Sequence, residues 1–279
     1  MPKMTALIYT LTIACSCYAV LCGLIFFKQK AILFPGAIND PVIMRGTTYQ
    51  PIFITANNNR LAGYQRSFQH SDNDAPTILY FGGNAEPSSH MLYHARELEV
   101  NEFYIFDYRG YGQSSGTTSE ATLFSDAEAI IDQLLAQGVA PSQLVIMGRS
   151  LGTAVAVHAA IYLQSKQPIH IRGLLLITPF TSMADVASHH YPWLPVNMLL
   201  NQKFNTLAAI DSNTVPLPPT LFMIAGNDKV TTTASAESLY QHWPGKKDRA
   251  VYHQATHNTI DQQDEYYPAI NQWLGQLKP

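Results

Sequence analysis

The segment Gly148-Arg149-Ser150-Leu151-Gly152 constrains the fold of this chain more than any other. The stretch before it, 143–147, is short, largely apolar and contains β-branched residues, which predicts a buried strand. The stretch after it, 153–163, is apolar nearly all round, as in a helix buried on most faces. G-x-S-x-G between a strand and a helix is the nucleophile elbow, in which the glycines let the two elements approach closely. We therefore predict that Ser150 is an exposed nucleophile on a strand–helix turn.

Strands alternate with helices along most of the chain. Apolar runs predict strands at 77–81, 103–107, 144–147, 173–177, 220–225 and 250–253. The intervening stretches predict helices at 88–98, 120–136, 153–165, 234–243 and 261–277. Upstream, 51–55 and 61–68 flank Asn57–Asn59 and predict an antiparallel hairpin. The pattern predicts an α/β fold with a mainly parallel sheet, antiparallel N-terminal edge strands and helices on both faces.

Two local features refine this prediction. Thr117 and Glu120 have the spacing of a capping box at the start of the helix 120–136. Residues 183–210 interrupt the alternation after the fourth parallel strand, and 189–200 is rich in aromatic residues and proline. We expect 183–210 to form a small lid over a substrate pocket; a packed loop with a short helix is the alternative.

A nucleophilic serine needs a histidine base and a carboxylate that orients the base. In this architecture the chain order is serine, acid, histidine, each just past the end of a strand. Asp228 lies in the turn just after the strand 220–225, and His257 lies after the strand 250–253. We therefore predict that Ser150, Asp228 and His257 form a catalytic triad.

Both downstream assignments have alternatives. Asp228 precedes Thr231-Thr232-Thr233 and has a residue type that also caps turns and helices. His253 is the rival histidine, but we expect it to lie on the strand, where it lacks the reach of a loop residue such as His257.

An acyl-transfer site also needs two N–H donors for the oxyanion. The N–H of Leu151 is one candidate, because it lies at the start of the elbow helix. The strand 77–81 is followed by Gly82-Gly83-Asn84-Ala85, where paired glycines let the main chain approach a substrate. We predict Asn84 N–H as the second donor; an ordinary glycine turn is the alternative.

These motifs together resemble the α/β-hydrolase superfamily, and within it the branch of mostly membrane-anchored, esterase-like serine hydrolases that includes depalmitoylases and lysophospholipid lipases. The resemblance covers roughly residues 30 to 279, and its most specific segments are 106–116, 148–152, 178–182 with 190–193, 226–228 and 257–258. It implies the same triad and the same oxyanion donors, Asn84 and Leu151.

The chain departs from this branch in the loop after the strand 77–81. Relatives often carry His-Gly-Asn-Ala-Gly-Asn, whereas this chain has Gly82-Gly-Asn-Ala-Glu-Pro87. The donor-bearing Gly-Asn-Ala is retained, but Glu86-Pro87 alters the loop exit and the pocket entrance. The segment 107–116, although rich in polar residues, is expected to be structural, with Asp107 and Arg109 fixing the strand end.

Residues 5–27 carry no charge and are long enough to cross a bilayer as a helix. We expect residues 1–30 to be a membrane anchor and 31–279 to be the catalytic domain. A cleaved signal peptide, or a leader lipidated at Cys15, is the alternative. Basic residues at positions 28, 30 and 45 slightly outnumber those before the segment, which favours a cytoplasmic domain. The expected location is the bacterial inner membrane.

Composition narrows the remaining classes. The 279 residues are 47% hydrophobic and 13% charged, with a net charge of −3, which suits a compact core plus a membrane segment. The sequence has no basic patch of the kind that binds a phosphate backbone, so we do not expect nucleic acid as a partner. The sequence contains neither an H-E-x-x-H motif, which would indicate a metal site, nor a G-x-G-x-x-G motif after a strand, which would indicate a dinucleotide site. We therefore expect no cofactor.

The expected function is therefore a serine hydrolase that cleaves acyl esters or thioesters through an acyl-enzyme, with lipid-like acyl substrates favoured by the anchor and the aromatic lid. A serine peptidase or amidase would use the same triad. A non-catalytic membrane-anchored scaffold or lipid-binding module is the alternative from another class.

Overall fold

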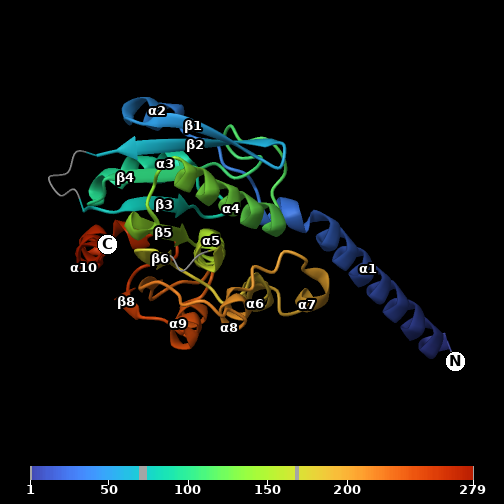
Figure 1. Ribbon diagram of the computed structural model, residues 1–279. Coiled ribbons are helices and arrows are strands. Elements are labelled where there is room, and N and C mark those ends of the chain that lie inside the picture. The colour runs from blue at the N-terminus through green and yellow to red at the C-terminus, as the bar shows by residue number, and fades with distance from the viewer. Residues whose placement is uncertain (1, 69–73, 167–169, 279) are drawn as a thin grey trace.

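The computed structural model describes residues 2–68, 74–166 and 170–278, and one mixed sheet forms the centre of this part of the chain (Figure 1). Its strands are β1 (Gln50–Ala56), β2 (Asn59–Ser67), β3 (Thr77–Phe81), β4 (Glu102–Phe106), β5 (Leu144–Arg149), β6 (Gly173–Ile177), β7 (Thr220–Ala225) and β8 (Lys247–Tyr252). Their spatial order is β1-β2-β4-β3-β5-β6-β7-β8. The six strands β3 to β8 are parallel to one another, and β2 pairs antiparallel with both β1 and β4. The predicted α/β-hydrolase fold with antiparallel edge strands is confirmed.

Helices cover both faces of the sheet. The helices of the described residues are α1 (Pro2–Leu33), α2 (Pro41–Gly46), α3 (Ser88–His94), α4 (Glu120–Ala136), α5 (Leu151–Lys166), α6 (Met183–His190), α7 (Val196–Leu199), α8 (Thr206–Asp211), α9 (Thr233–His242) and α10 (Tyr266–Gln276), with single 3₁₀ turns at Ala95–Glu97, Pro141–Gln143 and Ile260–Gln262. Side chains of α4, α5, α8 and α9 pack on one face, and those of α3 and α10 on the other.

Successive side chains of each central strand pack alternately against the helices on one face of the sheet and those on the other. In β5, Ile146 packs with the α4–α5 layer, whereas Val145 and Met147 pack with the α3–α10 layer. All three are fully buried, as expected for a parallel strand covered on both faces. This two-sided burial explains why the central strands are apolar runs and show no alternating pattern.

Some element boundaries differ from the sequence-based predictions. The helix expected at 261–277 begins only at Tyr266, because Pro268 is tolerated in a first helical turn but not further inside. The capping box of α4 uses Ser119 and Thr122, and the predicted pair Thr117 and Glu120 is wrong. The Glu120 carboxylate instead accepts hydrogen bonds from the N–H groups of residues 203 and 204.

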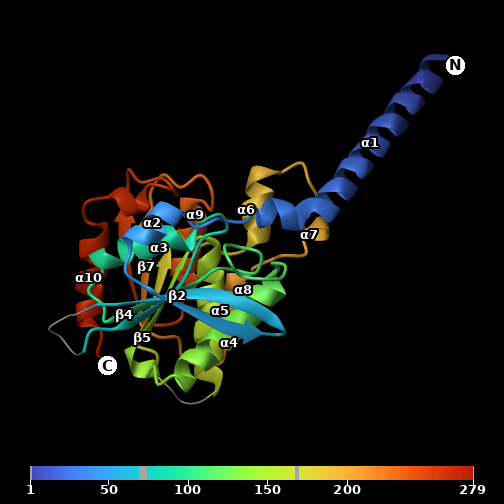
Figure 2. The same ribbon diagram turned by 90° about the horizontal axis from the view of Figure 1, so that it is seen from above.

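The segment expected to be a lid contains three short helices, α6, α7 and α8. Figure 2 shows α6 and α7 beside the base of α1, which projects away from the domain. Tyr18 and Gln29 of α1 make hydrogen bonds to main-chain groups of Trp193, Leu199 and Asn201. The helix α1 is long and apolar enough to cross a membrane. It continues to Leu33, beyond the expected segment 5–27.

The start of α5 packs against the sheet with no space for a side chain. A Cβ atom added to Gly152 would overlap the carbonyl oxygen of Phe81 in β3, and one added to Gly148 would overlap the main chain of Gly152. These glycines therefore allow α5 to begin directly at the end of β5.

We predict that Gly152→Ala lowers the free energy of unfolding by about 3 kcal/mol or more, because a rigid backbone must shift. Gly275→Ala in α10 is the control, since nothing lies within 4 Å of its added Cβ. It should change stability by no more than about 1 kcal/mol, in the stabilising direction. Denaturant unfolding of both variants in detergent measures the difference; equal effects would contradict the packing argument.

Candidate active site

Ser150 lies at the turn between β5 and α5. Its φ angle is 52°, in the left-handed region that non-glycine residues seldom adopt. The N–H of Ser150 donates to the carbonyl oxygen of Ile177 at the end of β6, with an N–O distance of 2.9 Å. Strained backbone of this kind persists where the surrounding structure holds it and is concentrated at functional sites.

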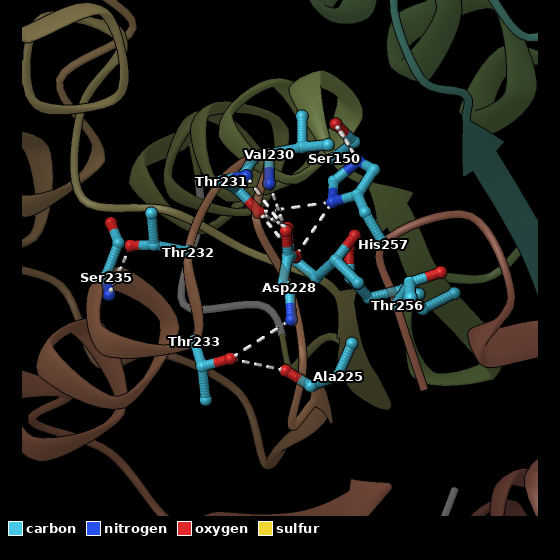
Figure 3. A network of polar contacts seen from close by, with 12 residues as sticks. Ser150, Ala225, Asp228, Val230, Thr231, Thr232, Thr233, Ser235, Thr256 and His257 are labelled. Atoms are coloured by element: carbon cyan, nitrogen blue, oxygen red, sulfur yellow. Dashed lines mark hydrogen bonds and ion pairs between the residues drawn. The ribbon is translucent and has the colours of Figure 1, made fainter. Parts of the chain in front are cut away.

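The three side chains predicted as a triad lie in one hydrogen-bonded row (Figure 3). The Oγ of Ser150 lies 2.9 Å from Nε2 of His257. On the other side of the ring, Nδ1 of His257 lies 2.8 Å from Oδ2 of Asp228. His257 and Asp228 are 7% and 8% exposed, so the carboxylate and the ring face each other largely out of water.

The Asp228 carboxylate also fixes the turn that follows β7. Its Oδ1 accepts from the N–H groups of Val230 and Thr231 at 2.7 and 3.1 Å, and its Oδ2 accepts from the Thr231 hydroxyl at 2.9 Å. Burial would raise the pKa of Asp228, but the contact with His257 and these donors outweigh burial, so its pKa lies below the ordinary value. Asp228 therefore caps the turn and also contacts the histidine. The prediction that it is the acid of the triad and the alternative that it is a turn-capping residue are thus compatible.

Thr231 is a residue of the site that the sequence did not reveal. Its Oγ1 lies 3.3 Å from His257 Nδ1 as well as within hydrogen-bond distance of Asp228. The available signal was its position three residues after an aspartate, which is typical of an Asx or ST turn.

The expectation that His253 lies on the last strand is wrong. β8 ends at Tyr252, and His253 lies in the following turn, where its side chain is exposed. The structure places His257 beside Ser150, so the distinction between the two histidines comes from the path of the loop.

The two predicted oxyanion donors, Asn84 and Leu151, flank the serine. The loop after β3 comes close to Ser150: a Cβ atom built on Gly83 would lie 3.7 Å from that of the serine. The main-chain N–H groups of Asn84 and Leu151 make no hydrogen bond with any of the residues described. Their role as oxyanion donors stays a prediction.

A buried carboxylate holds this loop in place. Oε2 of Glu86 accepts from the Gly83 N–H and from the Tyr80 hydroxyl, both at 2.9 Å. Burial opposes ionisation of Glu86, but His90, Arg149 and the Gly83 N–H together keep its pKa below the ordinary value. Arg149 also forms an ion pair with Asp261 at 2.9 Å. Glu86, where the chain departs from the resembled branch, thus connects the loop 82–87, which carries the predicted donor Asn84 and is called the donor loop below, to Arg149, the residue before Ser150.

The side chain of Asn84 connects the loop to α1. Its Nδ2 donates to the carbonyl oxygen of Leu33, the last residue of α1, at 3.1 Å. The Asn84 carbonyl accepts from the Tyr111 hydroxyl at 2.6 Å. The donor loop is therefore held by α1 on one side and by the segment 107–116 on the other.

The polar residues of 107–116 have structural partners, as expected, although Asp107 and Arg109 act separately. Asp107 accepts from Asn39 and Tyr64, and Arg109 forms a two-point ion pair with Asp126, at 2.8 and 2.6 Å.

A pocket of about 480 Å³ opens in front of the serine, lined by residues that include Asn84, Ser150, Val230, His257 and Asp261. A serine and a histidine that line one pocket, with a carboxylate hydrogen-bonded behind the histidine, have the arrangement that nucleophilic acyl transfer requires. No group of three or more His, Cys, Asp or Glu side chains within the described residues could hold a metal ion.

Comparison with known proteins agrees with the fold. The family model described as "Hydrolase_4: Serine aminopeptidase, S33" matches residues 73–215. An uncharacterised protein of Mycobacterium tuberculosis is 34% identical over 232 residues, which cover 78% of this chain and 77% of the relative. The chain therefore belongs to the α/β-hydrolase family, and this membership supports hydrolase activity.

Two further similarities are more distant. The lysophosphatidylserine lipase ABHD12 of Danio rerio is 31% identical over 191 residues, covering 63% of this chain and 49% of the relative. The esterase Pf2001 of Pyrococcus furiosus superposes with a TM-score of 0.64 at 18% identity, covering 86% of this chain and 94% of the esterase. At that identity the superposition shows a shared fold.

We predict that Glu86→Ala slows labelling of Ser150 by a fluorophosphonate by about 10²-fold, the loss that a small misplacement of site groups can cause. Glu86→Gln should restore most of the rate, because its amide oxygen can still accept from Gly83. Labelling rates of both variants, with thermal unfolding as the control for folding, test the role of Glu86. Equal rates for wild type and Glu86→Ala would exclude that role.

Proposed function

We propose that the protein is a serine hydrolase that cleaves acyl esters or thioesters. The observation that carries this proposal is the row of two hydrogen bonds, of 2.9 and 2.8 Å, that joins Ser150 to His257 and His257 to Asp228. The nearby N–H groups of Asn84 and Leu151, which have no partner among the described residues, support the same chemistry.

In the proposed reaction, Ser150 Oγ attacks the acyl carbonyl carbon while His257 Nε2 takes the serine proton. Asp228 accepts the hydrogen bond of the Nδ1–H and stabilises the imidazolium. Asn84 and Leu151 donate to the oxyanion. His257 then protonates the departing alcohol or thiol, leaving an acyl-enzyme. A water molecule, deprotonated by His257, releases the acid and restores the serine.

Lipid-like acyl compounds are the proposed substrates, and the segment 183–210 is the proposed lid. The lid contacts the edge of the site, because Nε2 of His190 lies 2.8 Å from the carbonyl oxygen of Val230, a residue of the pocket. The name of the zebrafish relative, a lysophosphatidylserine lipase, also favours a lipid ester.

The proposed location is the bacterial inner membrane, with α1 as a single-pass anchor and residues 31–279 as the catalytic domain. The length and apolar character of α1 support the anchor. Lys28, Lys30 and Arg45 follow the apolar segment, whereas only Lys3 and the amino terminus precede it, which favours a cytoplasmic domain.

We predict that the wild type hydrolyses p-nitrophenyl acetate and that Ser150→Ala abolishes both this activity and fluorophosphonate labelling. Asp228→Asn should lower kcat by about 10⁴-fold, because it stabilises the wrong tautomer of His257. Ester turnover, labelling and melting temperature are measured for each variant. Near-normal activity of Asp228→Asn would show that another residue is the acid of the triad. A folded wild type that is neither labelled nor active would indicate a non-catalytic scaffold.

Amide hydrolysis is a second candidate, favoured by the family description as a serine aminopeptidase. The same triad would act, and the leaving group would be an amine that His257 protonates.

Matched substrates separate the two candidates. For one acyl group presented as an ester and as an amide of the same leaving-group skeleton, we predict that kcat/KM for the ester exceeds that for the amide by at least about 10²-fold, or 2.7 kcal/mol of barrier. The reverse order, most of all for substrates with a free amino terminus, would favour the peptidase.

A further inference from the structure

We propose that the pocket between α1 and the α6–α7 segment binds one acyl chain of a membrane lipid whose ester reaches Ser150. The pocket has a volume of about 200 Å³ and lies apart from the pocket in front of the serine. The identity of the bound lipid as a substrate rests on the proposed hydrolase function, whereas the binding of the chain does not.

The walls of this pocket are apolar. Ile25, Ile32 and Leu33 of α1 form one side, and Ala187, Leu194 and Leu199 are among the residues of the other. Gln29 is the amide side chain in the lining, and its hydrogen-bonding groups are used: its amide nitrogen donates to the carbonyl oxygens of Phe26 and Leu199, and its oxygen accepts from the Asn201 N–H. Apart from the Tyr191 hydroxyl and the Trp193 indole N–H, the remaining side chains of the lining offer a ligand only hydrophobic contact.

The volume suits part of an acyl chain. A cavity of about 150 Å³ lined by aliphatic and aromatic side chains accommodates benzene, so about 200 Å³ has room for roughly six to eight carbon atoms of a chain. Apolar burial of this kind stabilises a bound ligand by about 0.8 kcal/mol per methylene group.

The pocket lies at the level of the membrane surface. Lys28 and Lys30, both exposed, mark the end of the uncharged part of α1 and can extend to lipid headgroups. At 1.5 Å per residue, Tyr18 lies about 15 Å further along the helix, on the bilayer side of Lys28. The Tyr18 hydroxyl nevertheless donates to the Trp193 carbonyl at 2.7 Å. The turn between α6 and α7 therefore follows α1 past the lysines toward the bilayer.

The exposed side chains of this turn and of α7 fit an interfacial position. Tyr191 and Trp193 in the turn are 48% and 52% exposed and Met198 of α7 is 85% exposed, beside a helix that is itself exposed over its apolar length. Tyrosine and tryptophan are enriched at membrane–water interfaces, where one part of the ring is wet and the other apolar. An acyl chain in the adjacent leaflet is thus the ligand that the surroundings of the pocket supply.

Leu33 connects this pocket to the candidate active site. Its side chain lines the apolar pocket, while its carbonyl oxygen accepts from Asn84, which lines the pocket in front of Ser150. A lipid held by its chain against α1 therefore has its ester end near the donor loop.

The test uses the full chain with Ser150→Ala, which cannot consume a substrate, in phosphatidylcholine vesicles that contain phosphatidylcholine with a diazirine on one palmitoyl chain. After photolysis, mass spectrometry maps the crosslinks. We expect them at residues 187–200 as well as on α1. Ala187→Trp, which fills the pocket, should lower the crosslinks at 187–200 by at least 10-fold, whereas His189→Trp, on an exposed position of the same helix, should not.

Activity gives a separate readout in the background with Ser150 intact. Ala187→Trp should lower the ratio of kcat/KM for p-nitrophenyl palmitate to that for p-nitrophenyl acetate by about 10-fold, and His189→Trp should leave the ratio unchanged.

Three results would overturn the proposal: crosslinks confined to residues 4–21 of α1, crosslinks at 187–200 that are unchanged by Ala187→Trp, or a second protein chain occupying the pocket in crosslinked dimers. The map on Ser150→Ala decides the proposal even if Ala187→Trp fails to fold. A wild type inactive on both esters but crosslinked at 187–200 would refute the proposed ester hydrolysis and leave the lipid site intact.

Discussion

The close contact between the start of α5 and the sheet is the constraint on which the candidate site depends. Because residue 152 has no side chain, only Ser150 separates the end of β5 from the start of α5, which lies directly against the carbonyl of Phe81. That short turn gives Ser150 its positive φ and places the Leu151 N–H at a helix start. The same contact brings the end of β3, and hence the loop with Asn84, to the serine. One packing distance therefore positions both Ser150 and the neighbouring N–H groups proposed as oxyanion donors.

Much of the fold could be predicted because its signals are local. Buried parallel strands are apolar runs, and the carboxyl ends of such strands meet at one edge of the sheet, so residues that follow them, such as Asp228 and His257, can be found by position. The ends of helices were harder to predict from the sequence where a tertiary contact determines them. The Glu120 carboxylate binds the main chain more than 80 residues away, so it leaves the capping role to Ser119 and Thr122.

One part of the site that the sequence did not reveal is long-range as well. Nothing in the spacing of Glu86 indicates that it neighbours Arg149, because that arrangement requires β3 and β5 to be adjacent. A buried charge is costly unless it is paired, and here the pairing is supplied by three separate segments. The loop that departs most from the resembled branch is thus fixed by interactions that only the folded chain provides.

The hydrogen bond from Asn84 to Leu33 has a practical consequence for handling the protein. Removing the hydrophobic helix to obtain a shorter fragment would leave the Asn84 amide without this acceptor and remove one wall of the pocket between α1 and the α6–α7 segment. Such a fragment would be expected to differ from the intact molecule at the candidate active site, so low activity of the fragment would not exclude activity of the full-length chain.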